Sequence, residues 1–248
     1  VAAAAAELRR IEWRWIGNFV AGLAVPDVTP ATLWSVLRNS ITPLAIGVVA
    51  TGLGALGAAM LTWPASVAFQ LDAHRFTGER LTALGRARRW LLLAAAKLVA
   101  LVCRAVPEVA WVVLLAVFFR LGVTPCVLAV ALHTTGVLHR VFTETLDNLP
   151  YGELEKVGNG GRGQIFLYGG LPRAWPDWRT YVFFQFEVNV RAGVALGMVG
   201  AGGLGHAFAF SLDWRDYPTA STLLWAMVLL TVLIDRTSRR LQLRRREC

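Results

Sequence analysis

An all-α integral membrane protein is the fold class that this sequence predicts, and three observations predict it. Of the 248 residues, 56% are hydrophobic and 17% are charged, whereas a soluble domain has about 45–50% apolar and about 25% charged residues. Five segments are apolar for the roughly 20 residues that a bilayer crossing needs. The basic residues behind the net charge of +9 collect at the ends of these segments. A soluble enzyme, a disordered chain and a secreted disulfide scaffold are therefore poor interpretations.

The predicted spans are helices, because lipid offers no partner for free backbone N–H and C=O groups. They cover residues 33–63, 90–119, 125–146, 181–199 and 220–234. The second segment is too long for one straight span, and we expect Pro107 to kink it by removing an internal hydrogen bond. In the fourth span, Gly193 and Gly197 either let another helix approach closely or reflect the general enrichment of glycine in membrane helices.

Lys and Arg residues are concentrated in alternate connections between the predicted spans. Cytoplasmic loops carry an excess of these residues. The first basic connection holds Arg75, Arg80, Arg86, Arg88 and Arg89, and the second holds Lys156, Arg162, Arg173 and Arg179. The tail of residues 239–248 is also basic, whereas the remaining connections add little more than Arg120 and Arg215. The two basic loops and the tail are therefore predicted to be cytoplasmic.

This orientation places residues 1–30 on the outer side and residues 31–238 in the transmembrane region. Leu8, Ile11, Trp15 and Phe19 recur at helical spacing, with basic residues on the other faces. The segment is either an interfacial helix in the headgroup plane or the tail end of an upstream span that this sequence lacks. With such a span, the native protein would have six.

The connection at about residues 148–178 is too polar and too long for a passive turn between two spans. It contains the run Glu153-Leu-Glu-Lys-Val-Gly-Asn-Gly160 and, further on, Leu171-Pro172. A Glu, a Gly six residues later and a Leu-Pro twelve beyond that are the pattern of the EAA loop of ABC importer permeases, which this connection resembles. Glu153 matches the motif glutamate.

The match to the EAA loop departs from the pattern at two places. Asn159 stands at the glycine position, where asparagine tolerates left-handed backbone better than most residues. Leu154 and Glu155 replace the alanine pair. The resemblance implies that the loop forms a short coupling helix that docks on an ATPase subunit, through Glu153, Leu154, Glu155, Val157, Gly158, Asn159, Gly160, Leu171 and Pro172.

A second resemblance covers most of the chain from about residue 100 onward. The runs Phe186-Glu-Val-Asn-Val-Arg191, Arg104-Ala-Val-Pro-Glu108, Ala131-Leu-His-Thr-Thr135 and Gly200-Ala-Gly-Gly-Leu-Gly205 resemble the permease of phosphonate ABC importers, a family that includes phosphite-type importers. It implies a type I importer transmembrane domain in the bacterial inner membrane. Its implied partners are a second copy of the chain, two ATP-binding subunits that hold ATP and Mg, a periplasmic binding protein and membrane lipid.

Charged residues inside the predicted spans are candidates for the translocation path. An Arg at the centre of a span costs about 2.5–3.5 kcal/mol on insertion scales. Arg191 follows Glu187 by four residues, and Arg104 precedes Glu108 by four, so each pair shares a helical face. These charges either line the path for an oxyanion or form two self-neutralised pairs that hold helices together. The candidate path residues are Glu108, His133, Thr134, Glu187, Asn189 and Arg191.

His133 and the glycines near residue 200 each have two interpretations. His133 contacts an anion when protonated, or it is a buried histidine satisfied by a backbone carbonyl. Gly200, Gly202, Gly203 and Gly205 formally satisfy the dinucleotide fingerprint, but that motif needs a strand before it and a helix after it in a soluble βαβ unit. We interpret these glycines as a close-packed turn at an outer gate, because glycine permits close backbone approach.

The remaining motifs favour transport over catalysis. No GxxxxGK[ST] loop occurs, so ATP hydrolysis through that machinery is expected on another polypeptide, with no cofactor on this chain. No catalytic constellation, metal-ligand spacing or nucleic-acid-binding face is evident, and Cys103 and Cys126 lie in apolar runs. We expect a permease that imports phosphonate, phosphite or phosphate by alternating access.

Two other function classes stay open. An ATP-independent anion channel or secondary carrier would be marked by an inverted repeat or a broken helix at the midplane, and no repeat is visible. A membrane-embedded enzyme would need a clustered acid/base or metal site.

Overall fold

The computed structural model describes residues 13–72, 82–150, 152, 154 and 161–243, and within these residues the ordered elements are helices. The long ones are α3 (Pro30–Ala65), α6 (Ala83–Ala105), α8 (Val123–Asp147), α11 (Leu171–Leu196) and α13 (Tyr217–Leu243). The shorter ones are α2 (Trp13–Leu23), α4 (Val67–Gln70), α7 (Glu108–Phe119), α10 (Arg162–Ile165) and α12 (Gly203–Asp213), with π-helical turns η1 (Phe166–Gly170) and η2 (Gly197–Ala201).

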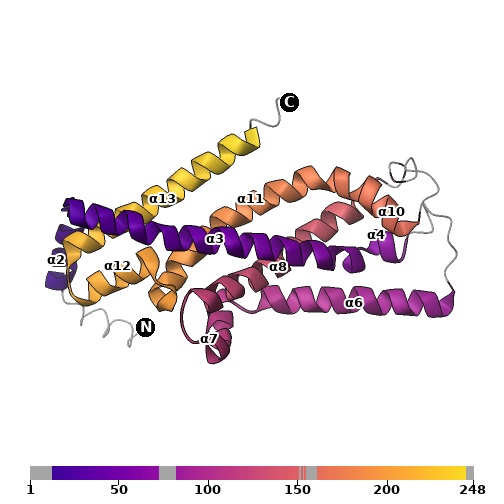
Figure 1. Cartoon of the computed structure of the whole chain (residues 1–248), viewed down its shortest axis with the longest axis horizontal. Coiled ribbons are helices and arrows are strands. Elements are labelled where there is room, and N and C mark those ends of the chain that lie inside the picture. The colour runs from indigo at the N-terminus through magenta and orange to yellow at the C-terminus, as the bar shows by residue number, and fades with distance from the viewer. Residues whose placement is uncertain (1–12, 73–81, 151, 153, 155–160, 244–248) are drawn as a thin grey trace.

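The predicted all-α membrane fold is confirmed. Four described segments are long and apolar enough to cross a membrane, and the pair α6 and α7 makes a fifth if it counts as one bent span. These are the five segments that the hydropathy pattern predicts. Helix α3 runs the length of the bundle, with α8 and α11 packed against it (Figure 1).

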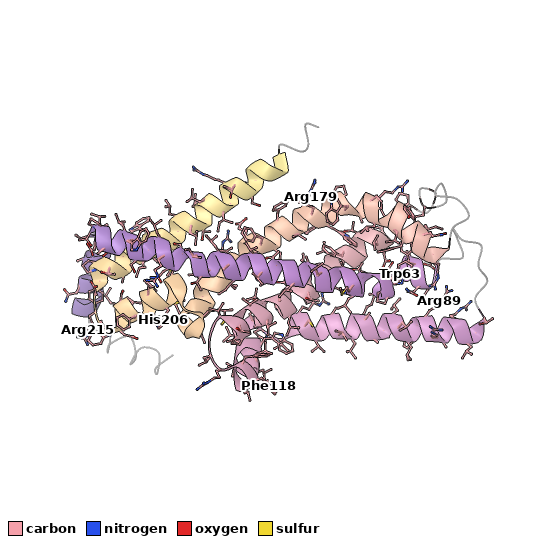
Figure 2. The ribbon with its side chains drawn as sticks, in the orientation of Figure 1. Trp63, Arg89, Phe118, Arg179, His206 and Arg215 are labelled. Carbon is pink, nitrogen blue, oxygen red and sulfur yellow. The ribbon has the colours of Figure 1, made fainter. Side chains whose placement is uncertain are left out.

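The two ends of the bundle hold different elements. Helices α2 and α12 gather at one end with the start of α13, and α4 and α10 lie at the other with the start of α6 (Figure 1). Arg89 lies at the α4 end and Arg215 at the α2 end (Figure 2). The basic start of α6 therefore shares an end with the connection that follows α8, as the charge pattern requires of two loops on one side. Which end is cytoplasmic stays a prediction.

The predicted kink at Pro107 is confirmed, because α6 and α7 meet at 96°. Val106 is extended, with φ −84° and ψ 124°, as expected for a residue before proline. Pro107 has no N–H to donate to the carbonyl of Cys103, four residues earlier. The Trp111 indole N–H donates to that oxygen instead, at 3.2 Å. The bend thus leaves the freed carbonyl satisfied.

The boundary expected for the fourth span is corrected at its start. Helix α11 begins at Leu171, about ten residues before the predicted start of that span, so residues 162–178 are helix within the connection predicted at 148–178. Arg173, Trp175 and Asp177 are exposed along its first turns. Hydropathy marks where a helix enters lipid rather than where it begins, and α11 continues past that point into a polar region.

The N-terminus of α3 is fastened by a short polar loop. The Asp27 carboxylate accepts hydrogen bonds from the Thr32 hydroxyl at 2.6 Å and from the Thr29 N–H at 3.0 Å, and these bonds lower the pKa of Asp27. The Thr222 hydroxyl of α13 donates to the Asp27 carbonyl at 2.7 Å. Helix α2 also packs against α13. Residues 1–12 lie outside the described residues, so both interpretations of the N-terminal segment stay predictions.

Small residues set the spacing of the central helices. A Cβ atom added at Gly54 of α3 would lie 2.5 Å from Cγ2 of Thr134 and 3.1 Å from the carbonyl oxygen of Ala131, both on α8. Gly193 of α11 likewise lies against Pro43 and Ile46 of α3, whereas Gly197 lies against Gly202 and Gly205. These contacts favour the close-approach interpretation of the small-xxx-small pair, although its two members face different neighbours.

We predict that Gly54→Ala lowers the free energy of unfolding by about 1–3 kcal/mol, because the added methyl group overpacks the contact between α3 and α8. Gly52→Ala is the matched control on the same helix, since an added Cβ there meets no atom within 4 Å. We expect it to leave stability unchanged or raise it by up to about 1 kcal/mol through helix propensity. Unfolding of the purified variants in detergent, followed by circular dichroism, measures both; equal midpoints would contradict the packing argument.

Candidate functional site: a platform for the polar loop and the charges in the spans

Asp147, at the end of α8, fastens the segment that follows α3. Its carboxylate accepts hydrogen bonds from the Ser66 hydroxyl at 2.5 Å and from the N–H groups of Val67 and Ala68 at 3.2 and 3.1 Å. Ser66 in turn caps α4 by accepting from the Phe69 N–H. Backbone donors at a helix start are otherwise unsatisfied, so one carboxylate joins the ends of α3 and α8.

An apolar cluster lies beside this junction. Phe69 and Phe166 meet edge to face with ring centroids 5.5 Å apart, and Trp63 lies 4.7 Å from Phe166. Leu154 and Ile165, on the two sides of the loop, are both fully buried in it. Gly170 gives Phe69 room, since a Cβ there would lie 3.0 Å from its ring. Both ends of the polar loop are thus embedded in the bundle.

Arg162 adds a polar tie to the same place. Its guanidinium donates to the Phe69 carbonyl at 3.2 Å and to Oε1 of Gln70 at 3.0 Å, and Gln70 donates to the Trp63 carbonyl at 3.1 Å. We call this assembly the loop platform. It consists of Trp63, Ser66, Phe69, Asp147, Leu154, Arg162, Ile165 and Phe166.

The predicted coupling residues divide into two groups. Leu154 is buried in the loop platform, and Leu171 and Pro172 begin α11 with Leu171 packed against the same cluster. The others lie outside the described residues: Glu153, Glu155, Val157, Gly158, Asn159 and Gly160. Sequence reasoning placed Arg162 in this basic connection and Ile165 on the inner side of the coupling helix, and it missed the other platform residues. The sequence carried two weak indications of these residues. Asp147 is an acidic residue at the end of an apolar segment, and Ser66 is a serine two residues after Pro64.

Two predicted path residues lie inside the bundle instead of on a surface. Asn189 of α11 is 1% exposed and Thr134 of α8 is fully buried. The Asn189 side-chain oxygen accepts from Thr134 at 3.1 Å and from Gln185 at 3.0 Å, and its nitrogen donates to the Thr51 hydroxyl of α3 at 2.8 Å. The four side chains form an amide cluster that joins α3, α8 and α11. Its polar groups satisfy one another.

The charged path residues fall at two other places. Glu187 and Arg191 form an ion pair on α11, in which Glu187 is 13% exposed and Arg191 51% exposed. Glu187 also lines a cavity of about 460 Å³ between α11 and α13. Glu108, at the start of α7, lies 3.7 Å from Nε2 of His133 on α8. The structure therefore separates the six candidates into the amide cluster, the Glu187–Arg191 pair and the Glu108–His133 pair.

One ring nitrogen of His133, Nδ1, is buried and has no hydrogen-bond partner among the described residues. The predicted backbone carbonyl is therefore not its partner there. No group of three or more His, Cys, Asp and Glu side chains suited to a metal ion occurs in the described part of the chain.

The glycines near residue 200 form a tight reversal between η2 and α12. Gly200, Gly202 and Gly203 have φ of 132°, 79° and 72°, in the region that L side chains rarely adopt. A Cβ at Gly203 would lie 2.7 Å from Cβ of Thr42 on α3. Gly205 is pressed against Val194 and Met198 of the preceding helix. The close-packed turn exists as predicted, and its role as an outer gate stays a prediction.

Comparison with known proteins assigns these features a family. Residues 81–245 match the family described as binding-protein-dependent transport system inner membrane component. The phosphate-import permease protein PhnE of Mycolicibacterium smegmatis is 36% identical over 129 residues, 51% of this chain and 24% of that protein. The phosphite transport system permease protein PtxC of Stutzerimonas stutzeri is 29% identical over 137 residues, 54% of this chain and 50% of that protein.

Two further likenesses agree with these. PhnE2 of Escherichia coli K12, named for a cryptic phosphonate transport system permease, is 32% identical over 117 residues, 46% of this chain and 96% of that protein. Among solved structures, a chain of the MetNI methionine ABC transporter superposes with a TM-score of 0.67 at 19% identity, covering 87% of this chain and 98% of its own. The chain thus spans half or less of the first two relatives, and the structural likeness concerns the fold.

We predict that Thr51→Val destabilises the bundle by about 1–2 kcal/mol, because it removes the acceptor of the buried Asn189 amide N–H. Thr237→Val is the matched control, since the exposed Thr237 hydroxyl donates only to carbonyls of its own helix, Leu233 and Ile234. Unfolding midpoints in detergent measure the difference, and a control variant that loses as much stability would refute the role of the amide cluster.

Proposed function

This chain belongs to the family of binding-protein-dependent transport system inner membrane components, and we propose that it is the membrane-spanning permease of an ATP-driven importer for a phosphorus oxyanion. It is a multi-pass protein of the inner membrane. In the proposed assembly, two copies form the transmembrane part, two ATPase subunits holding ATP and Mg dock on the polar loops, and an extracytoplasmic binding protein delivers the substrate.

The names of the relatives support the substrate class. They refer to phosphate, phosphite and phosphonate, which share a phosphorus centre carrying negatively charged oxygens. The alignments cover only part of this chain and half or less of the first two relatives, so the oxyanion is proposed at the level of this shared chemistry.

The loop platform is the observation that carries the ATP-driven mechanism. A loop that is pushed from below moves helices only if its ends are rigidly attached to them. Leu154 and Ile165 are fully buried at either side of the loop, and Arg162 ties it to the backbone at Phe69. Close-packed interiors transmit displacement instead of absorbing it. Asp147 then shares the movement between α3 and α8, whose ends it joins.

Alternating access follows from the same attachment. When the ATPase subunits close on ATP, we propose that they draw the two polar loops together and that the attached helices tilt as rigid bodies. The Gly200–Gly205 reversal then opens as the outer gate, and hydrolysis returns the bundle. Arg191 and the protonated form of His133 offer positive charge to the anion along the way, and Glu187 and Glu108 are their acidic neighbours.

Reconstitution tests the proposal. The chain, its ATPase partner and its binding protein are placed in proteoliposomes, and ATP hydrolysis and uptake are measured with methylphosphonate, phosphite and phosphate in parallel. We expect at least one of these to stimulate hydrolysis and to accumulate against its gradient. Flux that is independent of ATP would favour a channel or secondary carrier, and a chain that retains no ATPase subunit in detergent would contradict the proposal.

We predict that Ile165→Ala lowers uptake per ATP hydrolysed by about fivefold or more, because it loosens the attachment through which the loop acts on the helices. Leu167→Ala is the matched control, since Leu167 lies two residues away and is 54% exposed. Membrane insertion is expected to be retained in both variants. If the two variants take up the same amount of substrate per ATP hydrolysed, the loop platform does not take part in coupling.

We predict that Arg191→Ala slows uptake while leaving substrate capture by the binding protein unchanged, because the half-exposed guanidinium offers positive charge to the anion in the membrane. Uptake rates and equilibrium binding to the isolated binding protein are measured separately. Normal flux accompanied by a lower unfolding midpoint would instead support a purely structural ion pair.

A further inference from the structure

A second polar cavity lies between α6 and α8 and reaches Asp147 of the loop platform. Its volume is about 440 Å³. Lys97 and Arg104 line it from α6, and His139 and Thr143 line it from α8. Lys97 and Arg104 are seven residues apart, two helical turns, so both side chains lie on the face that α6 presents to α8. Sequence reasoning paired Arg104 with Glu108 and did not consider Lys97.

The acidic groups of this cavity are already engaged. Glu144 accepts a hydrogen bond from Arg140 at 2.7 Å on its own helix. Asp147 accepts from Ser66 and from the backbone at Val67 and Ala68. Lys97 and Arg104, by contrast, form no hydrogen bond or ion pair with any residue that the structure describes. With Arg140, the lining holds three cations against the two carboxylates of Glu144 and Asp147, so its formal charge is +1, and Lys97 and Arg104 are the cations without a partner among the described residues.

These two cations lie at membrane depth. Arg89 marks the basic end of α6, and at 1.5 Å per residue Lys97 lies about 12 Å and Arg104 about 22 Å further along the helix axis. The hydrocarbon core is about 30 Å thick. Unpaired cations at such depth are costly, and they usually mark a route for ions or substrates.

A close backbone contact between α6 and α8 borders the cavity at one end. Gly136 of α8 lies against α6, where an added Cβ would be 2.6 Å from the Ala100 carbonyl oxygen and 2.6 Å from the Arg104 nitrogen. This contact places Arg104 at the outer end of the cavity. At the other end, the Thr143 hydroxyl lies 3.5 Å from Nε2 of the buried His139. Thr143 thus offers a neutral donor near Lys97.

We propose that this cavity is a transient binding site for the phosphorus oxyanion during its passage, with Lys97 and Arg104 neutralising its charge and Thr143 donating a hydrogen bond. The proposal rests on the function proposed above and deepens it. Two cations with separate flexible side chains fit a tetrahedral anion of variable substitution, and Lys97 is exposed. A site of this kind attracts the anion without enclosing it. The anion can therefore leave again, which transport requires.

The Glu108–His133 pair lies one to two turns further along the same contact, since His133 precedes Gly136 by three residues on α8. The unpartnered Nδ1 of His133 therefore lies beyond the Arg104 end of the cavity. Between this pair and the cavity, α8 contacts the backbone of α6 at Gly136, so the two polar regions are separate.

The experiment uses the complete complex with its ATPase and binding protein in proteoliposomes, and measures uptake of phosphite, phosphate and methylphosphonate. We expect Lys97→Gln and Arg104→Gln each to lower maximal uptake about tenfold, while ATP hydrolysis stimulated by the binding protein stays within about twofold of wild type. Lys97→Arg keeps the charge and is expected to restore uptake. Arg38→Gln is the matched control, because Arg38 is an exposed cation on α3 outside the cavity.

A second arm separates the transported anion from a phospholipid headgroup, which carries the same phosphate chemistry. Thermal unfolding of each variant is compared in phosphatidylcholine vesicles with and without phosphatidylglycerol. A stabilisation by phosphatidylglycerol that both Gln variants lose, with uptake unchanged, would assign the cavity to lipid and overturn the proposal. Unchanged uptake alone would overturn it while leaving the importer intact, and a wild-type complex without ATP-dependent uptake would overturn both.

Discussion

Polar groups among these helices cannot rely on water, so they depend on partners within the protein. This constraint determines the contacts that define the bundle. The Asn189 amide joins three helices through Thr51, Thr134 and Gln185. Asp147 satisfies the start of α4, and the Trp111 indole satisfies the carbonyl that Pro107 leaves without a donor. Where polar groups have no such partner, at Lys97 and Arg104, a substrate is the natural candidate.

The two ends of the mechanism differ in how they are built. The loop platform is dense, aromatic and tied by charge-assisted hydrogen bonds to the backbone, as a transmitting joint must be. The α6–α8 cavity is open and its cations are not held by other residues that the structure describes. The proposed mechanism needs both, because movement must pass through the protein without loss whereas the anion must be released.

The spans and the bend at Pro107 were predictable from sequence, since hydropathy and proline stereochemistry act locally. The family resemblance was predictable too, because it depends on short runs such as Phe186–Arg191. The start of α11 was not, because its first turns are polar and their helicity depends on Leu171 packing into the platform. Two long-range partners were also hidden, since Thr51 is 138 residues from Asn189 and Ser66 is 81 residues from Asp147 along the chain.

The bend between α6 and α7 has a consequence for how the protein sits in lipid. Because α7 turns by 96°, its eleven apolar residues project to the side of α6 instead of prolonging it. Val117 and Phe118 are about 80% exposed on this arm, and Phe118 points away from the bundle (Figure 2). The arm therefore offers the surrounding lipid an apolar surface at the side of α6, next to the bend that follows Arg104.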